Sequence, residues 1–266
     1  MKKVNTKKSI LLASYDGSSR VPGTRLGPGV FFEWKKSYNP SLFEDFEKIN
    51  IPNVNQSSKV YLDLVETNCH KLFQDKGFTI VMGGDHSITI PSTRAFKDVY
   101  GEYNFIYFDA HDDYDKSEKT IKNWNVLNEI LEEASNVIMI GARFPNCKLN
   151  DYKNLDIINP FNFKESPLLD SIKSLEKLSN SSLPTYVSID VDVLSIHEFP
   201  GVSSGEPGGL TFRELVLILK YVFDKLKPVT IDVVEFNPMV ERDISLKTLN
   251  ALFTIIEEYG RAHNFK

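Results

Sequence analysis

Short apolar runs alternate along this chain with longer amphipathic stretches, and this alternation restricts the fold more than any other feature. The runs are rich in β-branched and aromatic residues, which is typical of strands buried on both faces of a parallel sheet. They cover residues 9–15, 78–82, 103–109, 136–141, 155–159, 185–190 and 229–236. Apolar residues at helical spacing lie between them, near 59–75, 91–100, 124–134, 167–178, 211–226 and 245–260. We therefore expect an α/β protein with a mostly parallel sheet covered by helices on both faces.

The composition narrows the class of protein. The chain has 266 residues without a linker, repeat or low-complexity segment, so we expect one domain spanning 1–266. The net charge of −5 and the lack of a long basic run disfavour nucleic acid as a partner. No apolar window is long enough to span a membrane. Two cysteines provide no disulfide framework and fit a reducing cytoplasm. A cytoplasmic enzyme acting on a small molecule is the expectation.

Polar residues that can bind a metal ion or take part in catalysis lie at the ends of four of the expected strands. His86 lies in "GGDHS" (83–87) after one strand, and Asp109 and Asp190 close two others. Glu235 lies near the end of the last strand. In open α/β sheets, ligands bind beyond the carboxyl ends of the strands. These four residues therefore predict a site at one edge of the sheet.

The segments "DAHDD" and "DVD" concentrate carboxylates at that edge. In an extended chain, side chains alternate between faces, so Asp109, His111 and Asp113 would share one side. The same spacing would place Asp190 and Asp192 together. Carboxylates that converge without lysine or arginine repel one another, and divalent cations are the usual compensation. Mixed carboxylate and imidazole ligands in this number suit two bridged ions, and favour Mn²⁺ over a thiolate-type zinc site.

Five motifs, in order, resemble the signatures of the ureohydrolase superfamily, which comprises arginases, agmatinases and formimidoylglutamases. They are "GGDHSIT" (83–89), "FDAHDDYD" (108–115), "SIDVDVL" (188–194), "GGLT" (208–211) and "DVVEFNP" (232–238), and "SYDGSSRVPGTRLGP" (14–28) resembles the N-terminal segment of the superfamily. The resemblance implies a three-layer α/β/α sandwich and a homo-oligomer, trimeric or hexameric.

The resemblance also implies roles for single residues. One Mn²⁺ would be held by His86, Asp109, Asp113 and Asp190, and a second by Asp109, His111, Asp190 and Asp192. A hydroxide bridging the two ions would attack an amidine-type carbon. Asp113 would carry its proton to the leaving nitrogen, and Glu235 would bind the cationic nitrogens of the substrate.

One departure from the arginases and agmatinases concerns a proton shuttle. Those enzymes usually carry a further histidine shortly after "DAHxD", whereas "KTIKNWNVLNEIL" (119–131) contains none. Asn123 takes its place by position and is a candidate substrate-binding residue, with Trp124 beside it. His197, five residues after Asp192, is an alternative source of the missing imidazole.

A second departure follows Asp192, where "DVLSIHEFPGVSSGEPGGLT" replaces the usual guanidine-hydrolase pattern. This segment resembles the formimidoylglutamases, which convert N-formimidoyl-L-glutamate and water to L-glutamate and formamide in histidine breakdown. An acidic substrate needs positive charge, for which Arg143, Arg20 and Arg25 are candidates. We expect a formimidoylglutamase. The alternatives are a guanidine hydrolase of agmatinase or arginase type that releases urea, and a catalytically silent paralogue acting as a partner subunit.

Overall fold

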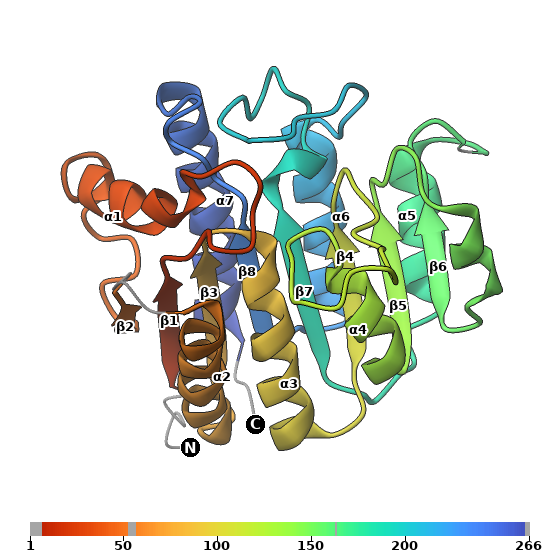
Figure 1. Cartoon of the computed structure of the whole chain (residues 1–266), viewed down its shortest axis with the longest axis horizontal. Helices are drawn as coiled ribbons and strands as arrows, with labels where there is room; N and C mark the ends of the chain where they lie inside the picture. Colours follow the sequence, from red (N-terminus) through yellow and green to blue (C-terminus); the bar gives the residue numbers. More distant parts are fainter. Residues whose placement is uncertain (1–6, 53–56, 163, 264–266) are drawn as a thin grey trace.

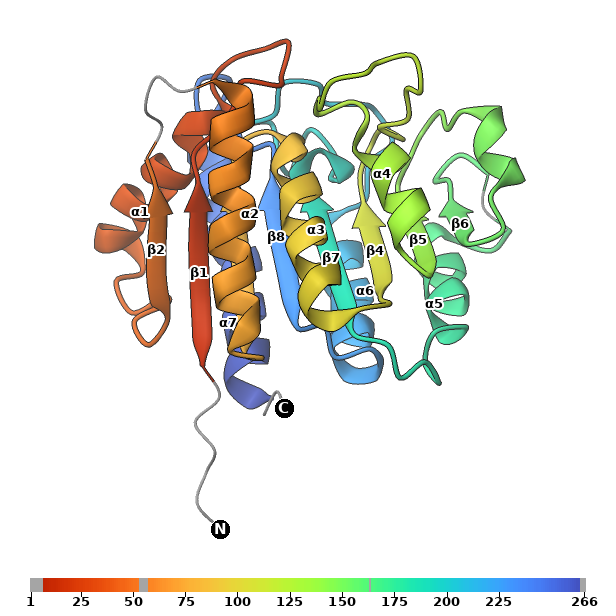
Figure 2. The ribbon, with the colours of Figure 1, turned by 60° about the horizontal axis from the view of Figure 1, so that its bottom comes forward.

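Parallel strands form the centre of the molecule in the computed structural model, which describes residues 7–52, 57–162 and 164–263. All arrows in Figure 2 point the same way. Within the described residues the sheet has eight strands in the order β2-β1-β3-β8-β7-β4-β5-β6. Their bounds are β1 Lys8–Ala13, β2 Glu47–Ile51, β3 Phe78–Gly83, β4 Asn104–Phe108, β5 Asn136–Ile140, β6 Leu155–Ile158, β7 Thr185–Asp190 and β8 Thr230–Val234.

Helices cover both faces of this sheet (Figure 1). One face carries α2 (Ser58–Gln74), α3 (Thr89–Tyr100) and α4 (Val126–Glu133). The other carries α1 (Gly27–Tyr38), α5 (Pro167–Glu176), α6 (Phe212–Lys225) and α7 (Asp243–Ala262). The predicted three-layer α/β/α sandwich with a parallel sheet is confirmed. None of the helices in the described ranges is long and apolar enough to cross a membrane.

Every strand of the sheet except the edge strand β2 contributes to both hydrophobic cores, because its side chains alternate between faces. In β4, Ile106 and Phe108 join the core under α5, α6 and α7, whereas Phe105 and Tyr107 join the core under α2, α3 and α4. All four side chains are fully buried. Burying one large apolar side chain contributes about 1.5–3 kcal/mol. This two-sided burial explains why the strands read as continuous apolar runs.

Two elements were not predicted from the sequence, β2 and α1. The segment "EKINI" of β2 pairs only with β1 at the sheet edge and buries only Ile51 fully, so it lacks the continuous apolar pattern. Helix α1 begins with "GPG", which is typical of a turn, yet it buries Phe31 against Phe253 of α7 with ring centroids 5.0 Å apart. Tertiary packing overrides weak local propensity in both cases.

The connections place β8 and β7 between β3 and β4. The chain crosses from β3 through α3 to β4 on one face. It later returns from β6 through α5 to β7, and from β7 through α6 to β8, on the other face. Four adjacent strands, β3, β8, β7 and β4, therefore end at the same edge. The register pairs Asp190 with Val234 and Phe108 with Ile189, so these strands end at nearly the same level.

Candidate metal centre

His86 reaches the centre of this edge through a tight turn after β3. The turn requires Gly84, because a Cβ there would lie 1.8 Å from the backbone oxygen of Tyr15. The N–H of His86 donates to Oε1 of Glu235 at 2.8 Å, and the N–H of Glu235 donates to the oxygen of Gly84 at 2.8 Å. The ends of β3 and β8 are therefore joined, and the imidazole of His86 is fully buried between them.

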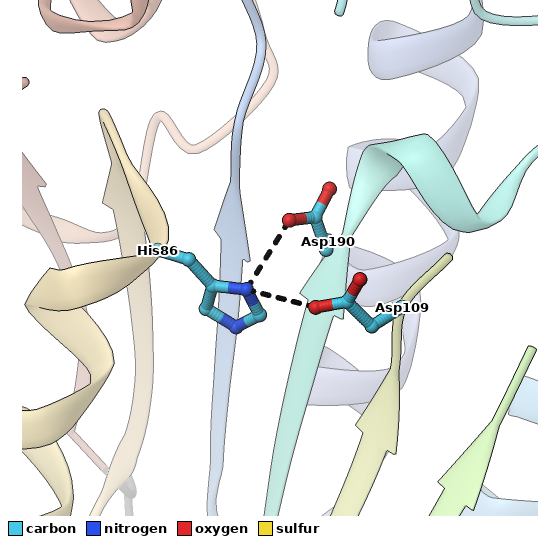
Figure 3. A group of neighbouring side chains, drawn as sticks. All are labelled: His86, Asp109 and Asp190. Carbon is cyan, nitrogen blue, oxygen red and sulfur yellow. Dashed lines mark ion pairs between the residues drawn. The ribbon is translucent and has the colours of Figure 1, made fainter. Parts of the chain in front are cut away.

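The imidazole of His86 faces three carboxylates. Its Nδ1 lies 3.1 Å from Oδ2 of Asp109, 3.2 Å from Oδ2 of Asp190 and 3.4 Å from Oδ2 of Asp113. Figure 3 shows His86 from the β3 side pointing between Asp190 of β7 and Asp109 after β4. One imidazole nitrogen and carboxylate oxygens at these separations form a donor set suited to a divalent cation.

A second donor cluster lies beside the first. Nδ1 of His111 lies 2.9 Å from Oδ2 of Asp192 and 3.5 Å from Oδ1 of Asp109. Asp109 belongs to both clusters, with one oxygen directed to each histidine. The six candidate ligands, His86, Asp109, His111, Asp113, Asp190 and Asp192, therefore converge on two neighbouring positions that share a carboxylate.

Turns, rather than continued strand alternation, bring these residues together. Strand β4 ends at Phe108, and Asp113 has a left-handed backbone with φ of 44°. Asp192 lies in a 3₁₀ turn, where its N–H donates to Oδ1 of Asp190 at 2.9 Å. The proposed grouping of side chains is observed, but the extended geometry from which we predicted it is wrong. Carboxylates that accept local N–H groups stabilise turns instead of strands.

The close packing of charged groups shifts the pKa values of the candidate ligands. Burial would lower the pKa of His86, but its contacts with Asp109 and Asp190 raise it well above the ordinary value. Burial and the nearby charge of Asp109 raise the pKa of Asp113 well above its usual range. Burial and the charge of Asp192 have the same effect on the pKa of Asp190. These shifts favour the protonated forms of the cluster, so protons and cations compete for it.

Two buried polar atoms of the cluster indicate that it can accept a cation. Among the described residues, Nδ1 of His86 and Oδ2 of Asp109 have no hydrogen-bond partner. In the described part of the chain, the carboxylates of Asp109, Asp113, Asp190 and Asp192 form ion pairs with histidine and not with lysine or arginine. Buried polar atoms are normally satisfied, and orphaned ones aimed at each other indicate a missing ligand. The donor set fits divalent metal ions.

A buried hydrogen-bond network that was not predicted from the sequence supports the imidazole of His86 at Nε2. Nε2 of His86 lies 3.0 Å from Oγ of Ser188, which donates to Oδ1 of Asp232 at 2.6 Å. The other carboxylate oxygen of Asp232 accepts from the hydroxyls of Tyr186 and Thr89. Such partners fix the orientation of a ligating imidazole. Ser188 and Asp232 stand within the quoted motifs "SIDVDVL" and "DVVEFNP", which is the only sequence signal for them.

Glu235 lies beside the metal cluster in a second left-handed backbone position, with φ of 68°. Burial and the neighbouring charge of Asp85 raise the pKa of Glu235 to about 8. Its Oε1 accepts from Nδ2 of Asn123 at 3.0 Å, in addition to the N–H of His86. Oδ1 of Asn123 is buried and has no partner among the described residues. Glu235 and Asn123 are thus brought together next to the predicted ligands.

A pocket of about 360 Å³ opens onto the cluster. It is lined by candidate ligands, by Glu235, Asn123 and Trp124, and by residues of two loops, 19–21 and 203–204. His86 and Asp109 lie beneath the lining and are fully buried. The pocket is large enough for a small linear substrate.

The structure does not bring Arg143 to this pocket, which corrects its prediction as a substrate-binding residue. Arg143 is 1% exposed, and its partners among the described residues are backbone oxygens, including those of Gly141 at 3.1 Å and Val193 at 2.9 Å. These bonds brace the turn that carries Asp192. His197 is exposed and does not line the pocket, so it does not replace the missing histidine.

Comparisons with known proteins agree with this geometry. A sequence model of the Arginase family matches residues 7–259. Proclavaminate amidinohydrolase of Streptomyces clavuligerus is 26% identical over 96% of this chain and 88% of its own length. Agmatinase of Neisseria meningitidis is 26% identical over 83% of this chain and 75% of its own.

Solved structures share the fold. That of proclavaminate amidinohydrolase from Streptomyces clavuligerus has a TM-score of 0.83 at 24% identity and covers 97% of this chain and 93% of its own. Formimidoylglutamase from Bacillus subtilis also has a TM-score of 0.83, at 21% identity over 96% of this chain and 87% of its own. The family match spans the sheet and all the candidate ligands. The chain therefore belongs to the arginase family and is a metal-dependent hydrolase acting on amidino or guanidino C–N bonds.

Proposed function

We propose that the chain acts as one catalytic domain that binds two Mn²⁺ ions. His86, Asp109, Asp113 and Asp190 hold one ion in this proposal, and Asp109, His111, Asp190 and Asp192 hold the other. The shared Asp109 and the two orphaned atoms of the first cluster support this assignment. When bound, the ions would supply positive charge and acidify a water so that it can attack an amidine carbon near neutral pH.

Asp113 is the proposed proton carrier. Its Oδ2 accepts from the hydroxyl of Tyr107 at 3.1 Å, which holds the carboxylate against His86. Asp113 lines the pocket whereas Asp109 is buried beneath it, so Asp113 would be accessible to a water and to a substrate bound there. It would take a proton from the water and deliver it to the leaving nitrogen.

Glu235 is the proposed anchor of the cationic end of the substrate. Oε1 already accepts from His86 and Asn123, so Oε2 is the oxygen left for a ligand. A cationic nitrogen would also restore a charge partner to this buried carboxylate, whose pKa is otherwise raised. Oδ1 of Asn123 supplies one further acceptor. Two acceptors suit a compact amidine.

We propose N-formimidoyl-L-glutamate as the substrate, converted with water to L-glutamate and formamide. One observation carries this choice. Asn123 stands beside Glu235 in the pocket, where the resemblance leads us to expect a histidine in guanidine hydrolases. A side-chain amide has no ionisation near pH 7, so Asn123 cannot serve as the acid or base that a histidine provides. A formimidoyl group is smaller than guanidinium and offers fewer donors, in keeping with the two acceptors.

A guanidine hydrolase that releases urea is the second candidate, favoured by the names of relatives such as agmatinase and proclavaminate amidinohydrolase. Water would then carry the proton in place of histidine.

A substrate panel with the Mn²⁺-loaded protein tests the proposal. N-Formimidoyl-L-glutamate, arginine, agmatine and 4-guanidinobutyrate are scored for formamide, urea and ammonia. We expect formamide from the first and little urea from the others. Rapid urea release from a guanidine with no formamide would refute the substrate and leave the family unchanged. A metal-loaded chain inert to the whole panel would favour the silent paralogue.

A homo-oligomer, trimeric or hexameric, is part of the same proposal. An exposed aromatic pair supports it, because Phe144 is 74% exposed and Phe161 51%, with ring centroids 5.5 Å apart. Large exposed aromatic surfaces often mark interfaces between subunits. The mass of the native protein in solution, measured by light scattering, distinguishes a monomer from a trimer or hexamer.

A further inference from the structure

The pocket carries opposite charges at its two ends. Its buried end is formed by carboxylates, including Asp113, Asp190 and Glu235. Within the described part of the chain, Arg20 is the one lysine or arginine among the lining residues, and it is exposed to solvent. Two divalent ions would balance the charges of Asp109, Asp113, Asp190 and Asp192. A cationic ligand would keep Glu235 ionised at the buried end, while Arg20 is positive at the exposed end. This arrangement complements a ligand with a cationic head and an anionic tail.

An aromatic ring holds Arg20 in place, and no carboxylate of the described residues forms an ion pair with it. Its guanidinium carbon lies 4.3 Å from the ring centroid of Trp124, within the range of a cation–π interaction. Among the described residues, no carboxylate lies close enough to Arg20 to form an ion pair, whereas Arg25 lies 3.6 Å from Asp16. Stacking on the ring leaves the N–H edges of the Arg20 guanidinium available for a planar anion.

The loop that carries Arg20 is tied to the rest of the site. The N–H of Ser18 donates to the buried carboxylate of Asp85 at 3.0 Å. Nδ2 of Asn237 donates to the oxygen of Pro22 at 3.2 Å and to Oγ of Ser203 at 2.9 Å. Asn237 therefore fixes the Arg20 loop relative to Ser203, whose hydroxyl hydrogen remains able to donate to a ligand. An anion between Arg20 and Ser203 would meet donors that are already positioned.

We propose that Arg20, stacked on Trp124, binds the carboxylate tail of the substrate and selects amidines with an anionic tail over those with a cationic tail. This rests on the proposed function, because it assumes that the amidine head lies against Glu235. An ammonium tail such as that of agmatine would instead approach the charge of Arg20. Tail recognition is remote from the reacting carbon, so its loss should raise KM more than it lowers kcat.

Two guanidines with tails of opposite charge provide the test, since 4-guanidinobutyrate ends in a carboxylate and agmatine in an ammonium group. We expect the Mn²⁺-loaded wild type to prefer the carboxylate compound, and N-formimidoyl-L-glutamate to follow the same rule. Arg20→Ala should lower kcat/KM for carboxylate substrates roughly 10- to 100-fold through KM, the loss expected for one charge-assisted contact. Arg20→Lys should recover part of it. Lys122→Met is the matched control, because Lys122 lies 5.6 Å from the same Trp124 ring but does not line the pocket.

A binding measurement separates this inference from the proposed function. Calorimetric titration of the metal-loaded protein compares L-glutamate with 1,4-diaminobutane, which need no turnover. We expect L-glutamate to bind, and Arg20→Ala to lower its affinity by a factor similar to the loss in kcat/KM. This should hold even if the chain hydrolyses guanidines rather than formimidoyl groups. Wild type that prefers agmatine or diaminobutane would overturn the inference. An unchanged KM and glutamate affinity in Arg20→Ala would do the same.

Discussion

Ionising the buried carboxylate of Glu235 is unfavourable in the metal-free protein, and bound metal ions and a cationic substrate would make it easier. Its pKa of about 8 in the folded metal-free protein exceeds the roughly 4.3 of an unfolded glutamate. Between these two pKa values, the Glu235 side chain is therefore protonated in the folded state and ionised in the unfolded state. Stability of the metal-free protein should fall as pH rises from about 4 through 8 because of this group.

The variant Glu235→Gln should remove that pH dependence. The amide oxygen still accepts from His86 and Asn123, so both hydrogen bonds at Oε1 survive. We expect the metal-free variant to be more stable than wild type at pH 8, by on the order of 2 kcal/mol, with little difference near pH 4.5. Urea denaturation at both pH values measures this. The exposed Glu258→Gln is the control, and an equal stabilisation at both pH values would argue against a titrating Glu235.

Asn123 offers a test of the chemistry at the residue scale. Asn123→His would place a titratable imidazole beside Glu235, and a positioned general acid or base typically contributes 10²–10⁴-fold. We expect urea release from guanidines to rise at least about tenfold relative to formimidoyl hydrolysis. The rate profile should gain an ionisation near pH 6–7. Asn123→Ala, which removes the amide without adding an imidazole, should gain neither; if it behaves as Asn123→His does, proton transfer is not the reason.

At the scale of single elements, the start of α6 is the clearest case where sequence and structure agree. Thr211 and Glu214 have the Thr-x-x-Glu spacing that favours a capping box, and the structure contains it. Thr211 accepts from the N–H of Glu214 at 3.1 Å, and Glu214 accepts from the N–H of Thr211 at 2.8 Å. Thr211→Ala should lower the free energy of unfolding by about 1 kcal/mol. Glu214→Gln keeps an acceptor and should cost less. Thermal melts measure both, and equal losses would mean that charge rather than capping stabilises this helix end.

The loop after β4 shows where prediction at this scale fails. An extended conformation for residues 109–113 predicts that Asp109, His111 and Asp113 lie on one side. They do lie together, but the backbone is not extended, because Asp113 has a positive φ. Aspartates hydrogen-bond to nearby N–H groups, as Asp109 does with the N–H of His111 at 2.6 Å. A period of two cannot be distinguished from a series of such turns by residue type alone.

At the scale of the molecule, metal ions should stabilise the fold because they bind only the folded site. Removing them should lower the melting temperature by about 10 °C, assuming an ion concentration near a thousand times the dissociation constant. Scanning calorimetry with and without chelator measures this, with metal loss checked by elemental analysis. Asp109→Ala, which removes the shared ligand, should not respond to chelator. A wild-type melting temperature that is unchanged after confirmed metal loss would contradict the prediction.

The sequence by itself determined the fold class, the strand and helix alternation and the donor types at the strand ends. These features are local, because periodic burial and turn residues leave their pattern in neighbouring positions. Edge strand β2 and helix α1 escaped detection because their stability comes from β1 and from α7.

Tertiary structure alone decided that β8 and β7 lie between β3 and β4, which brings Glu235 beside His86 across 149 positions of sequence. It also separated three arginines that look equivalent in the sequence. Arg143 braces backbone oxygens, Arg25 lies close to Asp16, and Arg20 lines the pocket. Strand order and the surroundings of a side chain depend on packing between distant segments, and no local pattern records that packing.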